Sequence, residues 1–158
     1  MSSNWRAQVN QKLYFAQLLL DDASTQSSAA QTALLEGAVF HLATAYRLYL
    51  KEIAHSQSHS TDAIDAISAR RELAKKGFVC QELEGLVRLE ESGSWPARLL
   101  AIYREVTGEV AKMASSKASA SMIAVADVTD SLDAEVCRQW LRQFQVLIES
   151  QREAAQEW

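Results

Sequence analysis

The sequence contains few of the residues that interrupt helices. Among its 158 residues, proline occurs once, at Pro96, and glycine occurs five times. Alanine, leucine, glutamate and glutamine, which lose little free energy on entering a helix, are plentiful. No segment alternates apolar and polar residues in the way that half-buried strands do. The composition therefore predicts an all-α fold.

Long apolar runs are missing as well. The run from Tyr14 to Leu20 is the nearest approach to a signal-peptide core, but Gln17 interrupts it and Asp21 follows it. No segment approaches the roughly 20 apolar residues that a membrane helix needs. Because neither a span nor a secretory signal is evident, we expect the chain to be cytoplasmic and to have no membrane partner.

Paired cysteines and clustered cations are the remaining absences. Cys80 and Cys137 lie far apart and form neither a CxxC motif nor a metal-ligand spacing, so we expect two reduced, buried thiols. The 16 lysines and arginines are scattered among 20 acidic residues, which gives a net charge of −4. Binding to a phosphate backbone needs a concentrated basic surface, so the sequence predicts no nucleic-acid partner.

Length and composition indicate one domain. A chain of 158 residues lies in the commonest size range for a single domain and is long enough to bury a core. Apolar residues make up 48% and charged residues 23%, close to the averages of globular proteins. We expect residues 1–158 to form a single domain, an up-and-down bundle of five to six helices.

Apolar residues at three- and four-residue steps mark the first two helices. We expect the first at Trp5–Ala23 and the second from Ser28 to Ala54, with Ser28 and Gln31 forming a capping box at its start. The second helix is apolar almost all round between residues 37 and 50. This pattern predicts a central position with neighbours on several sides.

The remaining helices follow from caps, breakers and apolar spacing. Residues 115–129 lack a helical period, and we expect an extended segment or a short helix there, with no role assigned. We expect a third helix that is capped by Thr61 or Asp62 and ends at Gly77, and a fourth over residues 78–91 that buries Val79. A fifth helix is expected from Pro96 to Met113. The last helix is expected to be capped by Asp130 or Ser131 and to end at Trp158.

Aromatic residues at helical spacing are expected inside the bundle. A stacking platform for nucleobases would need a basic groove beside the rings, and the sequence offers none. The predicted core aromatics are Tyr14, Tyr46, Tyr49, Trp140 and Phe144.

The last helix keeps its apolar side to the final residue. Ala154, Ala155 and Trp158 continue the side that Trp140 and Phe144 define. We therefore expect these three residues to be covered, in the first place by the end of the bundle and otherwise by a second copy of the chain.

Three segments together resemble a known family. They are residues 10–16, residues 36–54 of the expected second helix, and the chain end Glu157–Trp158. Over essentially its whole length the chain is similar to an uncharacterised family of short helical bacterial proteins, a domain of unknown function. The resemblance implies a helical fold and assigns no activity, cofactor or site.

One spacing has the form of a metal site. Glu52 and His55 form a Glu-x-x-His, which places a carboxylate and an imidazole on one helical face, as in di-iron bundles. Such a centre needs a second Glu-x-x-His, and the three histidines supply no second copy. His55 also stands where a helix end favours positive charge. The pattern favours a structural helix end over a metal site, and we expect no cofactor.

The central helix carries the candidates for a ligand pocket. His41 is flanked by apolar residues and is either a general base or a core histidine with a hydrogen-bond partner. Tyr46 and Arg47 are the other candidate ligand-binding residues. Arg47 and His55 resemble the Arg/His pair of HEPN ribonucleases, but the seven residues between them exceed that family's spacing and argue against a nuclease. We expect Arg47 at the surface or in an interface.

Two classes of function remain open. The sequence shows no nucleophile motif, metal set or phosphate-binding loop, so we assign no catalytic residue and favour a non-catalytic helical adaptor or subunit. Its partner is another protein or a second copy of the chain. The alternative is a small enzyme or ligand-binding bundle whose pocket lies near His41 and Tyr46. A cavity at His41, or an apolar patch outside the core, distinguishes the two classes.

Overall fold

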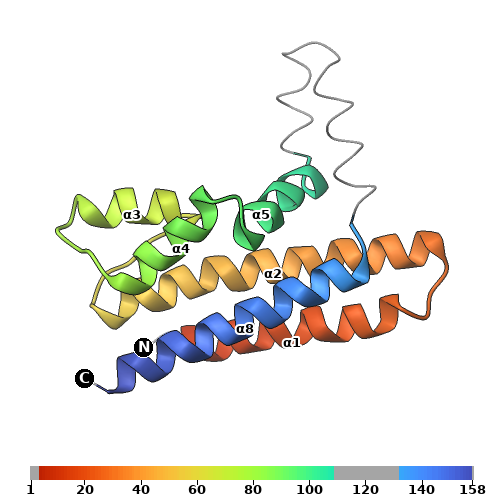
Figure 1. Ribbon diagram of the computed structural model, residues 1–158, viewed down its shortest axis with the longest axis horizontal. Helices are drawn as coiled ribbons and strands as arrows, with labels where there is room; N and C mark the ends of the chain where they lie inside the picture. Colours follow the sequence, from red (N-terminus) through yellow and green to blue (C-terminus); the bar gives the residue numbers. More distant parts are fainter. Residues whose placement is uncertain (1–3, 109–131, 158) are drawn as a thin grey trace, which may run out of the picture.

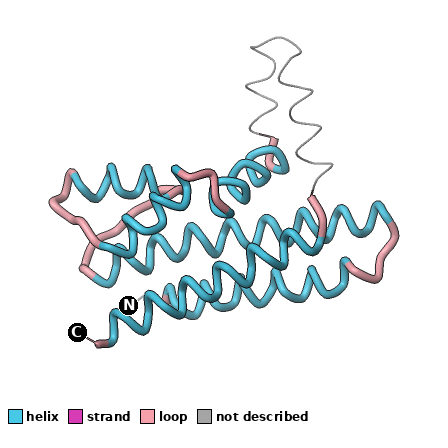
Figure 2. Tube along the Cα trace, in the orientation of Figure 1, coloured by secondary structure: helices cyan, strands magenta, loops and turns pink. Residues whose placement is uncertain are grey.

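The structure is a computed structural model that describes residues 4–108 and 132–157. Six helices and no strand occur in these residues (Figure 2), which confirms the predicted all-α helical bundle. None of the described helices is long and apolar enough to cross a membrane. The helices are α1 (Trp5–Ala23), α2 (Ser28–Ser56), α3 (Ala66–Ala74), α4 (Gln81–Glu91), α5 (Trp95–Val106) and α8 (Ala134–Gln156).

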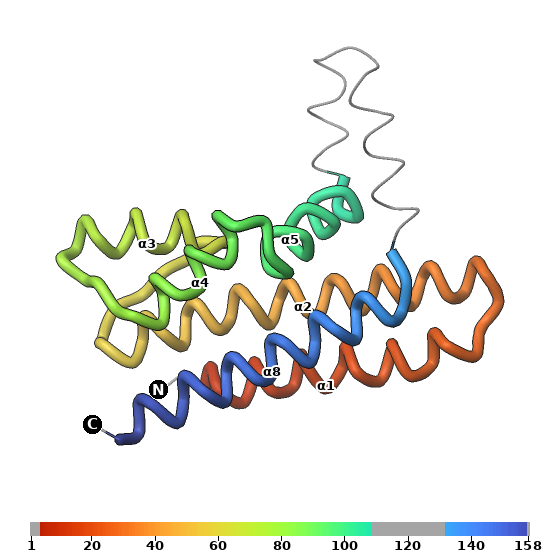
Figure 3. The backbone as a smooth tube through the Cα atoms, viewed as in Figure 1, coloured from red at the N-terminus to blue at the C-terminus, as the bar shows by residue number. Residues whose placement is uncertain are grey.

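The three long helices pack along one another. α1 and α2 form an antiparallel pair, and α8 runs parallel to α2 against both of them (Figure 1). The shorter helices α3, α4 and α5 follow α2 in the chain and form a second layer over one side of it (Figure 3). The start of α1 and the end of α8 lie at the same end of the bundle.

The central position predicted for the second helix is confirmed, because α2 contacts each of the other five described helices. Its approach to α1 depends on Gly37. Leu19 Cδ1 lies 3.0 Å from the point where a Cβ at this glycine would stand. A Cβ at this position would therefore require the end of the Leu19 side chain to move by a few tenths of an ångström.

An aromatic cluster joins α2, α5 and α8 in the core. The Phe144 ring centroid lies 5.1 Å from that of Trp95 and 5.8 Å from that of Tyr46. Tyr49 packs edge-on against the same ring at 6.0 Å. These rings and Trp140 are buried, so four of the five aromatics predicted in the core are found there.

Tyr14 is the exception, and its predicted burial is wrong. Its side chain is 59% exposed, whereas the neighbouring Leu13 is buried. One residue along a helix turns the side chain by about 100°, so the step from Leu13 to Tyr14 moves from the core side to the outer side of α1.

α2 begins at Ser28, as predicted, but the predicted capping box is wrong. The N-cap is Ser27, and its side chain makes no capping hydrogen bond. Gln31 does not close a capping box with Ser28, because its side-chain amide donates to the carbonyl oxygen of Ala23 at 3.1 Å. The glutamine thus ties the start of α2 to the end of α1.

Two other helices begin at aspartates that lie later in the sequence than expected. Asp65 accepts a hydrogen bond from the Ser68 N–H at 2.7 Å, and Asp133 accepts one from the Val136 N–H at 2.8 Å. Each carboxylate satisfies a backbone donor that a helix start leaves without an intrahelical partner. The predicted caps, Thr61 or Asp62 for the third helix and Asp130 or Ser131 for the last, are therefore wrong.

The connection from α3 to α4 is partly as predicted. Gly77 ends α3 with a φ of 78°, a left-handed conformation that glycine adopts without steric cost. α4 begins at Gln81, and the turn before it leaves Val79 exposed, so the predicted burial of Val79 is wrong. Phe78 fills the core position there. The predicted unbroken fifth helix from Pro96 to Met113 is wrong, because α5 ends at Val106 and Gly108 follows with a φ of 79°. The expectations for Met113 itself, residues 115–129 and Trp158 lie outside the described residues.

A buried carboxylate, Glu90 on α4, links three helices. The Tyr46 hydroxyl of α2 donates to Glu90 Oε1 at 2.7 Å. The first amides of α3 complete the site, since the Ala66 N–H donates to Oε1 at 2.6 Å and the Ile67 N–H donates to Oε2 at 3.1 Å. Burial and the adjacent Glu90 charge raise the pKa of Tyr46 above its usual range, so the hydroxyl keeps its proton and remains a donor. The positive end of α3 stabilises the carboxylate.

The end of α8 is fixed by two residues. Gln151 accepts a hydrogen bond from the Tyr49 hydroxyl at 2.5 Å and donates to the Glu82 carbonyl of α4 at 3.2 Å. Arg152 forms a two-pronged ion pair with Glu52, with N–O distances of 2.8 and 2.7 Å.

Beyond Arg152 the helix is no longer covered. Ala154 and Ala155 are exposed, so their predicted cover by the bundle is wrong for the single chain. The long neighbours α1 and α2 both terminate near this level, which leaves the last turn of α8 without a surface to pack on.

Replacing Glu90 should destabilise the fold through the donors it leaves without an acceptor. We expect Glu90→Gln to lower the free energy of unfolding by about 2–4 kcal/mol and Tyr46→Phe by about 1–2 kcal/mol, measured by chemical denaturation. Because the two residues share a hydrogen bond, the double variant should lose less than the sum of the single losses. Strictly additive losses would contradict the link.

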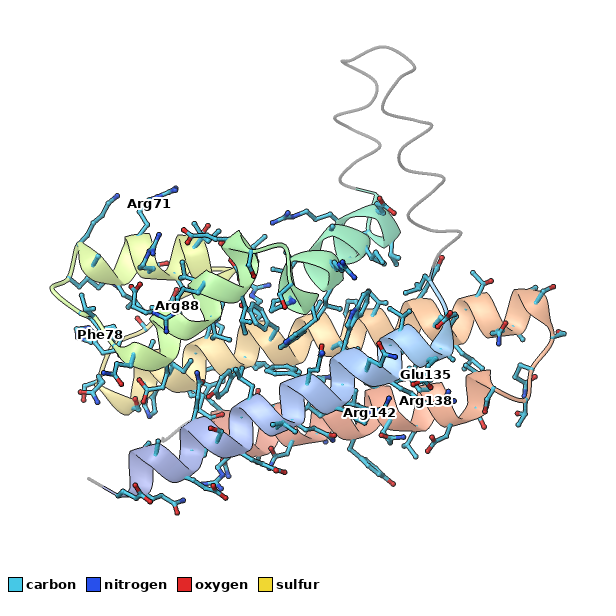
Figure 4. All side chains as sticks on the ribbon, in the orientation of Figure 1. Arg71, Phe78, Arg88, Glu135, Arg138 and Arg142 are labelled. Carbon is cyan, nitrogen blue, oxygen red and sulfur yellow. The ribbon has the colours of Figure 1, made fainter. Side chains whose placement is uncertain are left out.

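Two arginines on α8 allow a matched test of buried and exposed ion pairs. The Arg152–Glu52 pair is largely buried, whereas Arg142 pairs with Glu135 at 2.8 Å in solvent (Figure 4). We expect Arg152→Ala to cost about 1–3 kcal/mol and Arg142→Ala at most about 1 kcal/mol in thermal or chemical unfolding. Equal losses would show that Arg152 does not hold the end of α8.

Candidate functional site

A line of aromatic rings crosses the side of α2 that the core leaves uncovered. Phe15 of α1, His41 and Phe40 of α2, and Tyr103 of α5 follow one another with centroid distances of 5.4, 5.7 and 6.2 Å. We call these four residues the aromatic strip. The Phe40 side chain is 46% exposed, and the other three are half-buried. Tyr14 extends the strip at the α1 end, 6.5 Å from Phe15.

The strip follows from the position of two adjacent residues on α2. Leu42 and Val39, on either side of them in sequence, are fully buried. Phe40 and His41 therefore stand on the opposite side of the helix, about 100° apart, so one leans toward α5 and the other toward α1. Each then meets the aromatic residue of the neighbouring helix.

A groove lies at the α5 end of the strip. Its volume is about 240 Å³. Ala43 and Leu100 are buried at its base, while Phe40 and Ile64, the latter 38% exposed, stand at its sides. The remaining lining residues are Thr44, Arg47, Tyr103 and Arg104.

The charges around this groove are partly compensated. Arg104 lies 3.6 Å from Asp65, and Lys51 pairs with Asp62 at 2.5 Å. The Lys51 ammonium, and to a smaller extent the Arg47 guanidinium, hold the pKa of Asp62 below its usual range. Arg47 is exposed, as predicted, and forms no ion pair with any residue of the described ranges.

His41 occupies the middle of the strip. Its ring packs edge-on against Phe15 and Phe40, and its Nδ1 atom is buried without a hydrogen-bond partner among the described residues. Burial lowers the pKa of His41, and the nearby Lys12 charge lowers it further. Lys12 Nζ itself lies 5.4 Å from the centre of the Phe15 ring. At neutral pH the imidazole is therefore an uncharged part of an aromatic surface.

The structure does not bring the three predicted ligand-binding residues into one pocket. His41 and Tyr46 are five residues apart, about 140° around α2, so they face different sides. Tyr46 is fully buried and bound to Glu90, His41 belongs to the strip, and Arg47 lines the groove. The candidate residues therefore divide between the core and the surface.

The structure does not bring the predicted metal-site candidates Glu52 and His55 together in one site. Glu52 directs both carboxylate oxygens to Arg152, whereas His55 is exposed one turn further along α2. Across the described ranges, no three His, Cys, Asp or Glu side chains are grouped so that they could hold a metal ion. Glu52 acts as the anchor for α8.

The two cysteines are free, as predicted, but only Cys137 is fully buried. Burial raises the pKa of Cys137 to about 12 and that of the half-buried Cys80 to about 11. Both remain protonated at neutral pH, and thiols of this kind are poor nucleophiles.

Other hollows on the surface are less suited to a ligand. One of about 400 Å³ lies between α1 and α8, but Arg152 at its wall is already bound to Glu52 and Asn10. Another, of about 480 Å³, lies beside Val79 and Cys80 at the start of α4. The groove at α5 combines exposed aromatic and aliphatic side chains with a cation, Arg47, that pairs with no described residue.

The sequence pattern missed most residues of this site. Phe15, Phe40, Ile64, Tyr103 and Arg104 were not singled out as functional. A signal was present, since a helix that is apolar on all sides needs neighbours on all sides. α5 and α1 lie on either side of Phe40 and His41 without covering Phe40, so these aromatic residues remain at the surface.

Comparison with known proteins identifies a family but no activity. A family model described as a family of unknown function (DUF6586) matches residues 1–158. This match confirms the predicted resemblance to an uncharacterised family. No curated protein and no solved structure matches the chain.

The lowered pKa of His41 predicts a pH dependence of stability. The unfolded histidine titrates near 6.5, so below that pH the unfolded chain binds more protons than the folded chain. The stability contribution is present above about pH 6.5 and is lost as the pH falls toward the lower folded pKa. We expect the denaturation midpoint to fall more between pH 8 and pH 5 for the wild type than for His41→Gln. Parallel pH profiles for the two proteins would rule out this role of His41.

Proposed function

Since the chain belongs to the family of unknown function DUF6586, which supplies no activity, we propose that it is a non-catalytic helical adaptor. It binds another protein through the aromatic strip and the adjoining groove. The observation that carries this proposal is the exposure of Phe40, in contact with His41 and Tyr103, on a helix whose other side forms the core.

The composition of the surface supports protein binding. Aromatic residues and arginine are enriched where proteins bind one another, and they supply most of the binding free energy. The strip places three aromatic side chains and one imidazole in a row, with Arg47 and Arg104 at one end. A partner that covers Phe40 and Ile64 removes two large apolar side chains from water at once.

The state of the polar groups near α2 favours binding over catalysis. The Tyr46 hydroxyl is bound to Glu90, and the Glu52 carboxylate is bound to Arg152, so all four side chains are engaged in structural contacts. His41 packs on two aromatic rings, and within the described ranges its Nδ1 has no acidic or other hydrogen-bond partner that would orient it as a general base. These contacts support an adaptor rather than the small enzyme considered as the alternative.

The proposal places the adaptor in the cytoplasm, with a protein rather than a nucleic acid as partner. Free cysteines at residues 80 and 137 suit a reducing compartment. The acidic pI of about 5.4 suits a protein partner better than a phosphate backbone.

A pull-down with matched variants tests the proposal. Wild-type protein, Phe40→Glu and Val146→Glu are used as baits in a lysate of the source cells. Both substitutions replace an exposed apolar side chain with a carboxylate, one in the strip and one on α8. We expect at least one protein to be captured by the wild type and by Val146→Glu, and its capture by Phe40→Glu to fall at least about tenfold.

Reconstitution with that protein in purified form must then give a stoichiometric complex on size exclusion. The same column measures self-association, which distinguishes a foreign partner from a second copy of the chain. Capture that is equal for all three baits, or lost equally by both variants, would overturn the role of the strip.

A further inference from the structure

We infer that the partner docks as an amphipathic helix, with an apolar side chain in the groove beside Phe40 and a carboxylate placed against Arg47. This inference rests on the proposed function and specifies its partner. It follows from the size of the groove, the charge at its rim and the spacing of the strip.

The size of the groove limits what it can hold. Sites for drug-sized ligands usually measure about 300–1,000 Å³ and enclose most of the ligand. The groove measures about 240 Å³, and its base is formed by the apolar side chains of Ala43 and Leu100. It therefore suits one or two apolar side chains of a partner, anchored between Phe40 and Ile64.

The charge at the rim of the groove favours an acidic residue next to the apolar anchor residue of the partner. Asp65 lies beside Arg104, and Asp62 binds Lys51, so each of these cations already faces a carboxylate. Arg47 is the rim cation that has no carboxylate partner within residues 4–108 and 132–157. A carboxylate of the partner can pair with its planar guanidinium through two hydrogen bonds, whereas a basic partner would be repelled.

The spacing of the rings indicates a helical partner. Successive ring centroids along the strip are 5.4–6.2 Å apart. One turn of an α-helix advances 5.4 Å, so a helix lying along the strip brings about one apolar side chain per turn over each ring. This is the helix-in-groove mode, in which residues at i, i+3 or i+4, and i+7 act as anchors.

The strip continues past the groove toward α1. His41 is uncharged at neutral pH and presents an aromatic surface between Phe40 and Phe15. The line of rings is therefore unbroken from Tyr103 to Phe15, with Arg47 at its α5 end and the Lys12 ammonium over Phe15 at its α1 end. A partner helix that lies along the strip places the carboxylate that pairs with Arg47 at the α5 end.

A displayed library of random 16-residue peptides provides the probe. The library is selected on the full wild-type chain, and enriched peptides are synthesised and measured by fluorescence anisotropy. Four variants are compared with the wild type: Phe40→Ala and Arg47→Glu in the site, and Val146→Ala and Arg71→Glu as controls. Val146 is an exposed apolar residue of α8, and Arg71 is an exposed arginine on the outer part of α3 (Figure 4).

We expect enriched peptides to carry Asp or Glu next to large apolar residues at helical spacing. Phe40→Ala and Arg47→Glu should each weaken binding at least about tenfold, and the two controls should change it less than about twofold. Changing the acidic residue of the peptide to its amide should weaken binding to the wild type and have little effect on binding to Arg47→Glu. This coupling isolates the proposed contact from any general loss of stability.

Two contrary outcomes are distinguishable. Peptides that require Phe40 but are basic, non-helical or indifferent to Arg47 would overturn the inference and leave the adaptor proposal intact. Enriched peptides that bind Phe40→Ala as well as the wild type, or a selection that enriches none, would overturn both.

Discussion

The buried Glu90 carboxylate is the constraint on which the second layer of the molecule depends. A carboxylate is expensive to remove from water unless each oxygen gains strong hydrogen bonds. Glu90 obtains them from the Tyr46 hydroxyl and from the amides of Ala66 and Ile67 at the positive end of α3. The same three bonds fix α4 to α2 and determine where α3 starts.

The position of α3 in turn shapes the groove. Asp65 precedes the two amides that Glu90 binds, and it also lies within 3.6 Å of Arg104 on α5. Ile64, the next residue toward the N-terminus, lines the groove opposite Phe40. A polar contact inside the core thus sets the separation between surface residues on three elements. The position of the aromatic strip on α2 has a separate cause, because Phe40 and His41 are flanked in sequence by the fully buried Val39 and Leu42.

Much of the fold could be predicted from the sequence, because helical periodicity is a local property. The bounds of α1, the central position of α2, the stop at Gly77 and the first turn at Pro96 all follow from spacing and from the conformational limits of single residues. Helix caps were less predictable, since several serines, threonines and aspartates stand near each helix start. Asp65 and Asp133 were selected over nearby candidates by the packing of the rest of the chain.

The candidate site was much less predictable, because it depends on which part of α2 is not covered by another helix. His41, Tyr46 and Arg47 were identified by residue type, and only two of them are at the surface. Phe40 was read as one more apolar residue of a buried helix. Its exposure became evident only when the structure showed that α1 and α5 lie on either side of Phe40 and His41 without covering Phe40.

Native-state amide hydrogen exchange on the wild type and Glu90→Gln tests the central claim most directly. If Glu90 fixes α3 against α2, the amides of Ala66 and Ile67 should exchange at least about tenfold faster in the variant. The amides of α1 and of the first half of α2 should keep most of their protection, because their packing does not involve Glu90. Unchanged protection at Ala66 and Ile67, or an equal loss across all helices, would contradict the account.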